Sequence, residues 1–96
     1  MARSRRPDEE LIENEQQRLQ REDLKWLMSE RAGRRIVWRL LEEAGVFRSS
    51  FTGDAEGTFF AEGRRAVGLS WLGMVTGYCR DEFVLMLKEH EEDAST

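Results

Sequence analysis

Residues 23–45, with the sequence DLKWLMSERAGRRIVWRLLEEAG, decide the fold that we expect for this chain. The stretch predicts a helix, a short break and a second helix. Asp23 is placed to cap the first helix over residues 24–31. Ala32-Gly33 predicts a break or bend, because glycine costs about 1 kcal/mol in a helix interior, and a continuous helix through Gly33 is the alternative. The second helix is expected over residues 34–44.

The second of these helices is the clearest amphipathic segment of the chain. Its apolar residues recur at helical spacing, which predicts a wide buried stripe of Ile36, Val37, Leu40, Leu41 and Ala44. Gly45 then predicts a left-handed C-cap, with Val46 and Phe47 folded back onto the last turn.

The sequence predicts two further helices. The first covers residues 58–78 with Thr58 as its N-cap, and the second begins at Asp81 and ends near residue 91. On the longer helix the expected apolar face comprises Phe59, Phe60, Val67, Trp71, Leu72, Met74, Val75 and Tyr78. Four glycines on the same helix predict close approach of another helix, or alternatively a kink or break at one of them or the helix end at the last: Gly63, Gly68, Gly73 and Gly77.

The N-terminal 22 residues differ from the rest of the chain. Residues 1–7 are basic, with Arg3, Arg5 and Arg6, and we expect them to be disordered. Residues 8–22 predict a polar helix that cannot bury enough apolar surface to hold itself in place. Its narrow stripe of candidate partner contacts consists of Leu11, Ile12 and Leu19. Such a helix either frays, and is then partly disordered, or becomes ordered against a partner or another copy, and we expect the second.

Length and charge complete the expected architecture. The 96 residues suffice for one small domain, which we predict to be an all-α bundle of about four helices over residues 23–90. Residues 1–22 form a basic arm and a partner-dependent helix. Residues 91–96 are expected to be a disordered acidic tail. Residues 23–88 carry ten basic and nine acidic groups, so the body lacks the basic surplus of a generic nucleic-acid binder.

The chain holds few groups for catalysis. Its single cysteine, Cys79, allows no intrachain disulfide and is expected to be a small buried residue, and its single histidine, His90, is expected at the surface. No phosphate-binding loop, HExxH motif or calcium loop is present. No apolar run approaches the roughly 18 residues of a membrane span, and no signal segment is visible. We expect a soluble, non-exported protein that is not an enzyme and takes no cofactor or metal.

Arginine pairs are the most informative polar residues. Arg34 and Arg35 recur in type as Arg64 and Arg65, on different predicted helices. A guanidinium binds carboxylates or phosphates, so these four could form ion pairs with Glu30, Glu42 and Glu62, contact a protein partner, or bind nucleic acid. Trp26, Trp38 and Trp71 are candidates for core or interface. Phe51, in the polar loop of residues 48–57, is a candidate core plug or exposed contact.

Three segments together resemble a known family: DLKWLMSERAGRRIVWRLLEEAGVFRSSF, TFFAEGRRAVGLSWLGMV and EFVLMLKE. They are similar to small proteins of podovirus-type tailed bacteriophages, encoded in the structural gene cluster near the portal and scaffold genes. The resemblance covers residues 23–90. Its most specific parts are Gly33-Arg34-Arg35, the apolar helix ending in Leu41, and residues 62–65.

The resemblance implies a virion or virion-assembly protein without enzymatic activity, made in the host cytoplasm. Its partner would be a portal, tail or capsid component, at the portal and tail junction or inside the head, and we expect several symmetric copies. Two alternatives remain open. One is a nucleic-acid-associated accessory protein that uses the paired arginines, and the other is a soluble helical adaptor that regulates a host protein.

Overall fold

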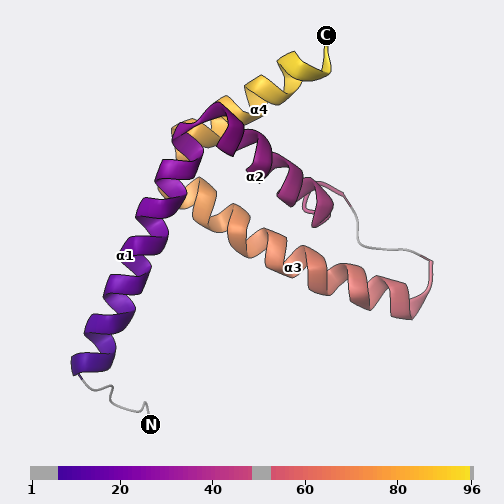
Figure 1. Cartoon of the computed structure of the whole chain (residues 1–96). Coiled ribbons are helices and arrows are strands. Elements are labelled where there is room, and N and C mark those ends of the chain that lie inside the picture. Colours follow the sequence, from indigo (N-terminus) through magenta and orange to yellow (C-terminus); the bar gives the residue numbers. More distant parts are fainter. Residues whose placement is uncertain (1–6, 49–52, 96) are drawn as a thin grey trace.

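The computed structural model describes residues 7–48 and 53–95, with side chains described from Asn14 onward. Within these ranges the chain forms four helices and no strand (Figure 1). The expected all-α fold of about four helices is therefore confirmed. Phe51, the arginines of the basic arm, and the side chains of Leu11 and Ile12 lie outside the described parts. The helices are α1 (Pro7–Ser29), α2 (Arg31–Glu43), α3 (Ala55–Tyr78) and α4 (Arg80–Ala94).

The break between α1 and α2 lies at Glu30, earlier than expected. Glu30 has an extended backbone (φ −103°, ψ 137°), and its carbonyl accepts the first bond of α2 from the Arg34 amide. The predictions that Asp23 starts a new helix and that Ala32-Gly33 interrupts one are wrong, because both positions lie inside helices. Gly33 instead permits the corner, since a Cβ there would lie 1.8 Å from the Leu27 carbonyl oxygen.

The end of α2 forms as the sequence predicts. Gly45 has a positive φ of 79°, and its amide bonds to the Glu42 carbonyl while the Val46 amide bonds to that of Leu41. These two bonds define a Schellman motif. Val46 and Leu41 are both buried in the core, which supplies the hydrophobic contact that accompanies this motif.

The outer ends of α3 and α4 differ from their predicted bounds. Asp54, and not Thr58, caps α3, because its side chain accepts a bond from the Gly57 amide at 2.6 Å. A single residue, Cys79, separates α3 from α4. Helix α4 continues to Ala94, so most of the acidic segment after residue 91, expected to be disordered, is helical.

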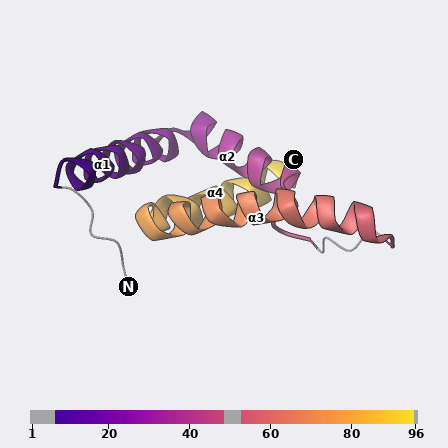
Figure 2. The ribbon, with the colours of Figure 1, turned by 90° about the horizontal axis from the view of Figure 1, so that it is seen from below.

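The four helices form two thin layers. Figure 2 shows α1 and α2 in one layer and α3 and α4 in the other. A small core lies between them and consists of Leu24, Met28, Val37, Leu41, Val46, Val75, Cys79 and Met86. The burial of Cys79 confirms its expected structural role.

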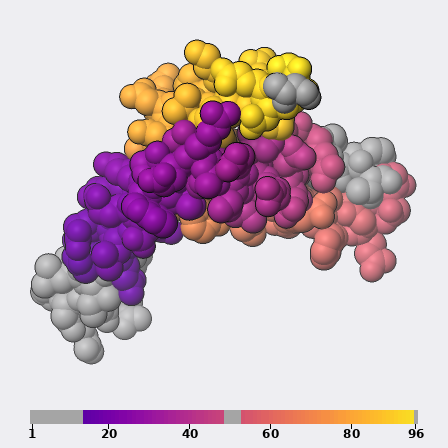
Figure 3. All heavy atoms as spheres, turned by 45° about the horizontal axis from the view of Figure 1, so that its top comes forward, coloured from indigo at the N-terminus to yellow at the C-terminus, as the bar shows by residue number. Residues whose placement is uncertain are grey.

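The molecule is extended and flat. It measures 52 × 38 × 16 Å, and its radius of gyration is 16.9 Å, whereas a compact chain of this length would have about 12–13 Å. The described N-terminal part of α1 projects away from the other helices (Figures 1 and 3). Among side chains that the structure describes, nine apolar ones are buried while fourteen large apolar ones are exposed. The fold thus leaves much of its apolar surface uncovered.

Candidate interaction surfaces

The two buried charged residues among those that the structure describes, Arg34 and Glu89, join three helices. Arg34, on α2, pairs through its Nε with Glu89 of α4, and its NH1 donates to the Met28 carbonyl at the end of α1, at 2.9 Å. Both charged residues are buried, at 9% and 6% exposure. The exposed Arg31 adds a second contact to Glu89 at 3.1 Å. Arg34 therefore braces the corner where α1, α2 and α4 meet.

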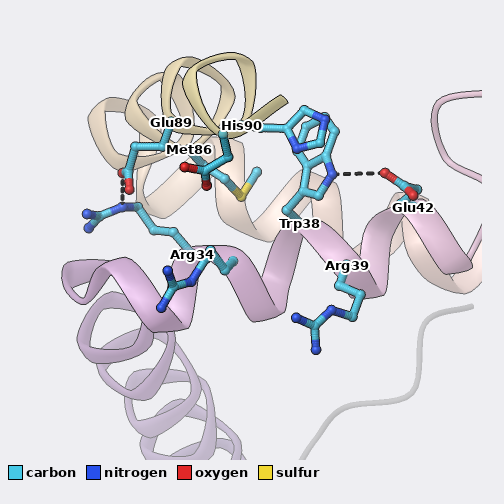
Figure 4. A pocket seen from close by; sticks show the side chains of 9 residues that line it. Arg34, Trp38, Arg39, Glu42, Met86, Glu89 and His90 are labelled. Carbon is cyan, nitrogen blue, oxygen red and sulfur yellow. Dashed lines mark hydrogen bonds and ion pairs between the residues drawn. The ribbon is translucent and has the colours of Figure 1, made fainter. Parts of the chain in front are cut away.

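A shallow cleft of about 250 Å³ lies beside this pair, between α2 and α4 (Figure 4). At its centre His90 stacks on Trp38 with ring centroids 3.9 Å apart, and Trp38 stacks on Phe47 at 4.7 Å. The Trp38 indole donates to the Glu42 carboxylate at 2.9 Å. His90 therefore lies in an open surface cleft, as expected, but it is half-buried in an aromatic stack.

This cleft offers little for catalysis. Arg35 and Arg39 line it, and Figure 4 draws the Arg39 side chain pointing away from Glu89 and His90. Cys79 lies in the core, where burial raises the pKa of its thiol. A protonated, buried thiol is a poor nucleophile. Among the described residues, no three His, Cys, Asp or Glu side chains are grouped to hold a metal ion.

The second arginine pair, Arg64 and Arg65, lies in the N-terminal half of α3. Arg64 is exposed, and its guanidinium carbon lies 6.0 Å from the centre of the Phe60 ring, at the limit of a cation–π contact. Arg65 is half-buried. Phe59 and Phe60 are 75% and 74% exposed. In this segment of α3, two exposed phenylalanine side chains therefore lie beside a positively charged guanidinium.

An apolar groove follows the inner side of α1 toward α2 and α3. It has two adjoining parts, of about 440 and 340 Å³, which share Leu24, Leu27 and Trp71. We call it the α1–α3 groove and define it by Leu19, Leu24, Leu27, Leu40, Val67 and Trp71. Its size far exceeds the roughly 30 Å³ share of one water molecule, so the fold leaves a substantial apolar hollow open.

The glycines of α3 behave differently from one another. At Gly68 a Cβ would lie 2.6 Å from both Ala44 Cβ and Val46 Cγ2, so the close neighbour there is the C-cap of α2 and the turn that follows it. At Gly63, Gly73 and Gly77 a Cβ would meet nothing within 4 Å. Only Gly68 among the four is thus explained by the packing of the described chain on itself.

One of three comparisons with known proteins bears on identity. A family model described as Bbp19-like phage protein matches residues 24–88, which is more than half of the chain. The chain belongs to this family. The match spans the corner between α1 and α2, all of α3 and most of α4, and therefore includes Arg34, but not Glu89, and the α1–α3 groove apart from Leu19. Comparison with curated proteins and with solved structures gave no match.

Membership establishes a phage protein, in agreement with the coarser part of the resemblance seen in the sequence. In the described residues no helix is both long enough and apolar enough to span a bilayer.

Of the predicted contact residues, Leu19, Arg35 and Arg64 are exposed, whereas Arg34 is buried. Trp26 and Trp71 are exposed by 69% and 46%, and Trp38 is half-buried.

Sequence reasoning missed the Arg34–Glu89 pair, whose partners are 55 positions apart. The three acidic partners considered for the arginines were Glu30, Glu42 and Glu62, and none of them pairs with Arg34 through an ion pair. A usable signal was present nonetheless. Arg34 lies three and seven positions before Val37 and Leu41, on the buried stripe of α2, and Glu89 lies three positions after the buried Met86. A charge on an apolar stripe indicates a buried charge at each position, although it does not identify the partner.

Proposed function

We propose that this phage protein is a component of the virion or of its assembly pathway, and that it packs against a neighbouring structural protein. The observation that carries this proposal is the bare apolar surface of α3. Phe59, Phe60 and Val67 are 75%, 74% and 62% exposed. Burying one such side chain contributes about 1.5–3 kcal/mol, so a partner that covers three gains substantial affinity.

The chemistry of the remaining groups also favours a binding role over catalysis. Arg34 is neutralised by Glu89, the His90 ring is stacked on Trp38, and Cys79 is buried. With Arg34 used internally, fewer arginines are left to meet phosphates, which favours a protein partner over nucleic acid. The partner would be a portal, tail or capsid component that meets several symmetric copies of this chain.

The test is quantitative mass spectrometry of purified mature particles and of empty precursor shells from the phage that encodes the chain. Copy number is measured against the major capsid protein, and a phage replication enzyme serves as the control for contamination. A fixed copy number in mature particles supports a structural role. Presence in precursors alone supports an assembly role. Absence from both overturns the proposal, and the salt dependence of DNA binding then tests the nucleic-acid alternative.

The proposed contact face is tested by complementation of a gene deletion. Phe60→Ser removes an exposed apolar contact, whereas Val84→Ser, on α4, is the matched control at an exposed position of 58%. We expect Phe60→Ser to fold normally and to be depleted from particles at least tenfold, with Val84→Ser retained. Equal incorporation of both variants would show that this part of α3 is not the contact face.

A further inference from the structure

The outward side of α2 carries two arginines that the described chain does not use. Arg35 and Arg39 are both exposed and lie one helical turn apart. Neither guanidinium forms a hydrogen bond or an ion pair with a described residue, whereas Arg31 and Arg34, on the same helix, both pair with Glu89. Figure 4 shows the Arg39 side chain pointing away from α4. Both arginines are therefore available to a ligand from outside the chain.

Exposed apolar side chains lie beside these arginines. Ile36 and Leu40 follow Arg35 and Arg39 directly in the sequence and are 46% and 58% exposed. The spacing i, i+1, i+4, i+5 places all four residues on one side of the helix, which we call the α2 outer face. Its basic edge borders the cleft against α4, and its apolar edge borders the α1–α3 groove, which Leu40 also lines.

The carboxylates around this face do not bind its arginines. Glu42 accepts its hydrogen bond from the Trp38 indole. Asp93 pairs with Arg31 at 3.3 Å. Glu43, at the end of α2, forms no ion pair with a described residue. Because the two glutamates keep their negative charges beside the face, the face offers two unpaired sets of N–H donors without a general excess of positive charge.

This combination favours a protein over nucleic acid as the ligand. A guanidinium binds a single carboxylate through two parallel hydrogen bonds. A nucleic-acid strand would instead bring a row of phosphates toward Glu42 and Glu43 as well, and residues 23–88 carry only ten basic groups against nine acidic ones. The exposed Ile36 and Leu40 suit the apolar side chains of a protein interface.

We propose that the α2 outer face docks an amphipathic helix of the neighbouring structural protein, with two carboxylates of that helix bound to Arg35 and Arg39. A helix fits because side chains four positions apart on it repeat the spacing of the two arginines. Its apolar side chains cover Ile36 and Leu40. The inference rests on the proposed function and specifies the chemistry of the partner at a surface separate from the exposed phenylalanines of α3.

Photo-cross-linking in purified particles tests the docking. A photoreactive p-benzoylphenylalanine replaces Ile36, and the same label at Val84, 58% exposed on α4, is the matched control. We expect the label at position 36 to join one segment of another virion protein that is rich in Asp and Glu, and the control label not to join that segment.

The other outcomes separate this inference from the proposed function. Attachment of the label to a second copy of the chain, to DNA or to a segment without acidic residues overturns the inference. The inference also fails if the chain is present in particles and the label joins nothing, although the proposed function then stands. Absence of the chain from particles and precursor shells overturns both.

Charge reversal tests the role of the arginines. Arg39→Glu is expected to lower the yield of this cross-link about tenfold or more, per copy of the chain in the particle, because the partner carboxylate then meets a like charge. Arg39→Lys should retain most of the yield. Lys88→Glu, exposed on α4, is the matched control for the same change of charge. Circular dichroism checks that each purified variant keeps its helices. Equal yields for Arg39→Glu and Lys88→Glu would overturn the inference.

Discussion

Removing the charge of Glu89 gives the sharpest test of how this fold is held together. In Glu89→Gln the Arg34 guanidinium stays buried without a carboxylate partner. Breaking a fully buried ion pair from one side costs about 3–5 kcal/mol. Two features reduce that figure here: the bond from Arg34 to the Met28 carbonyl persists, and the glutamine oxygen still accepts a neutral hydrogen bond. We expect a loss of about 2–3 kcal/mol in the free energy of unfolding.

The contact between Glu89 and Arg31 changes this expectation little. It is lost in the same variant, but the Arg31 side chain is 52% exposed, and ion pairs with such groups contribute about 0–1 kcal/mol. In a domain of this size a loss of about 2–3 kcal/mol lowers the melting temperature by roughly 8–24 °C. The pair is therefore expected to supply a large part of a stability that is itself only about 5–15 kcal/mol.

Urea unfolding followed by far-UV circular dichroism measures the effect at one fixed protein concentration. Glu91→Gln is the matched control, because it removes the same charge from an exposed position on the same helix and should change stability by less than about 0.5 kcal/mol. Arg34→Lys keeps the charge but cannot reach both Glu89 and Met28, so we expect a loss of about 1 kcal/mol. A Glu89→Gln variant within 0.5 kcal/mol of wild type would refute the bracing role.

Three other features give shorter tests. Gly33→Ala should destabilise by more than about 3 kcal/mol in urea, because its Cβ meets backbone at 1.8 Å, whereas Gly73→Ala, in open space, should stabilise by up to about 1 kcal/mol. Asp54→Ala removes the α3 cap and should lower thermal stability by about 1 kcal/mol. Cys79 should resist alkylation in the native state. Because burial raises the native pKa of its thiol, stability should fall as pH rises above about 8.5, the unfolded pKa.

Local sequence signals predicted the local structure well. The Schellman end of α2 follows from Gly45 and the apolar residue after it, and the four-helix, all-α fold follows from the apolar periodicity of each segment. The errors at Asp23, Gly33 and Thr58 share one physical cause. Each residue type is a common helix boundary, but the boundary is chosen by the packing of the corner and the loop, which a local pattern does not contain.

Long-range pairing could be predicted only in part. Arg34 and Glu89 each lie on a buried stripe, so a buried charge at either position was foreseeable, but their mutual contact depends on how α2 crosses α4. The stack of His90 on Trp38 depends on the same crossing. A sequence pattern defines the face of a helix but not the angle at which two faces meet.

The prediction that Phe60, Val67 and Trp71 share an apolar face can be reconciled with their exposure in the structure. Apolar residues that recur at helical spacing indicate a helix face suited to burial, and the pattern does not distinguish burial by the same chain from burial by another. For Val37 and Leu41 the cover is intramolecular, because both lie in the core. Phe60, Val67 and Trp71 are 74%, 62% and 46% exposed, so the described residues cover them only in part, and the radius of gyration of 16.9 Å shows that the chain does not collapse over them. Under the proposed function, the apolar residues that follow the helical period but stay exposed in this fold form the surface that the partner would cover.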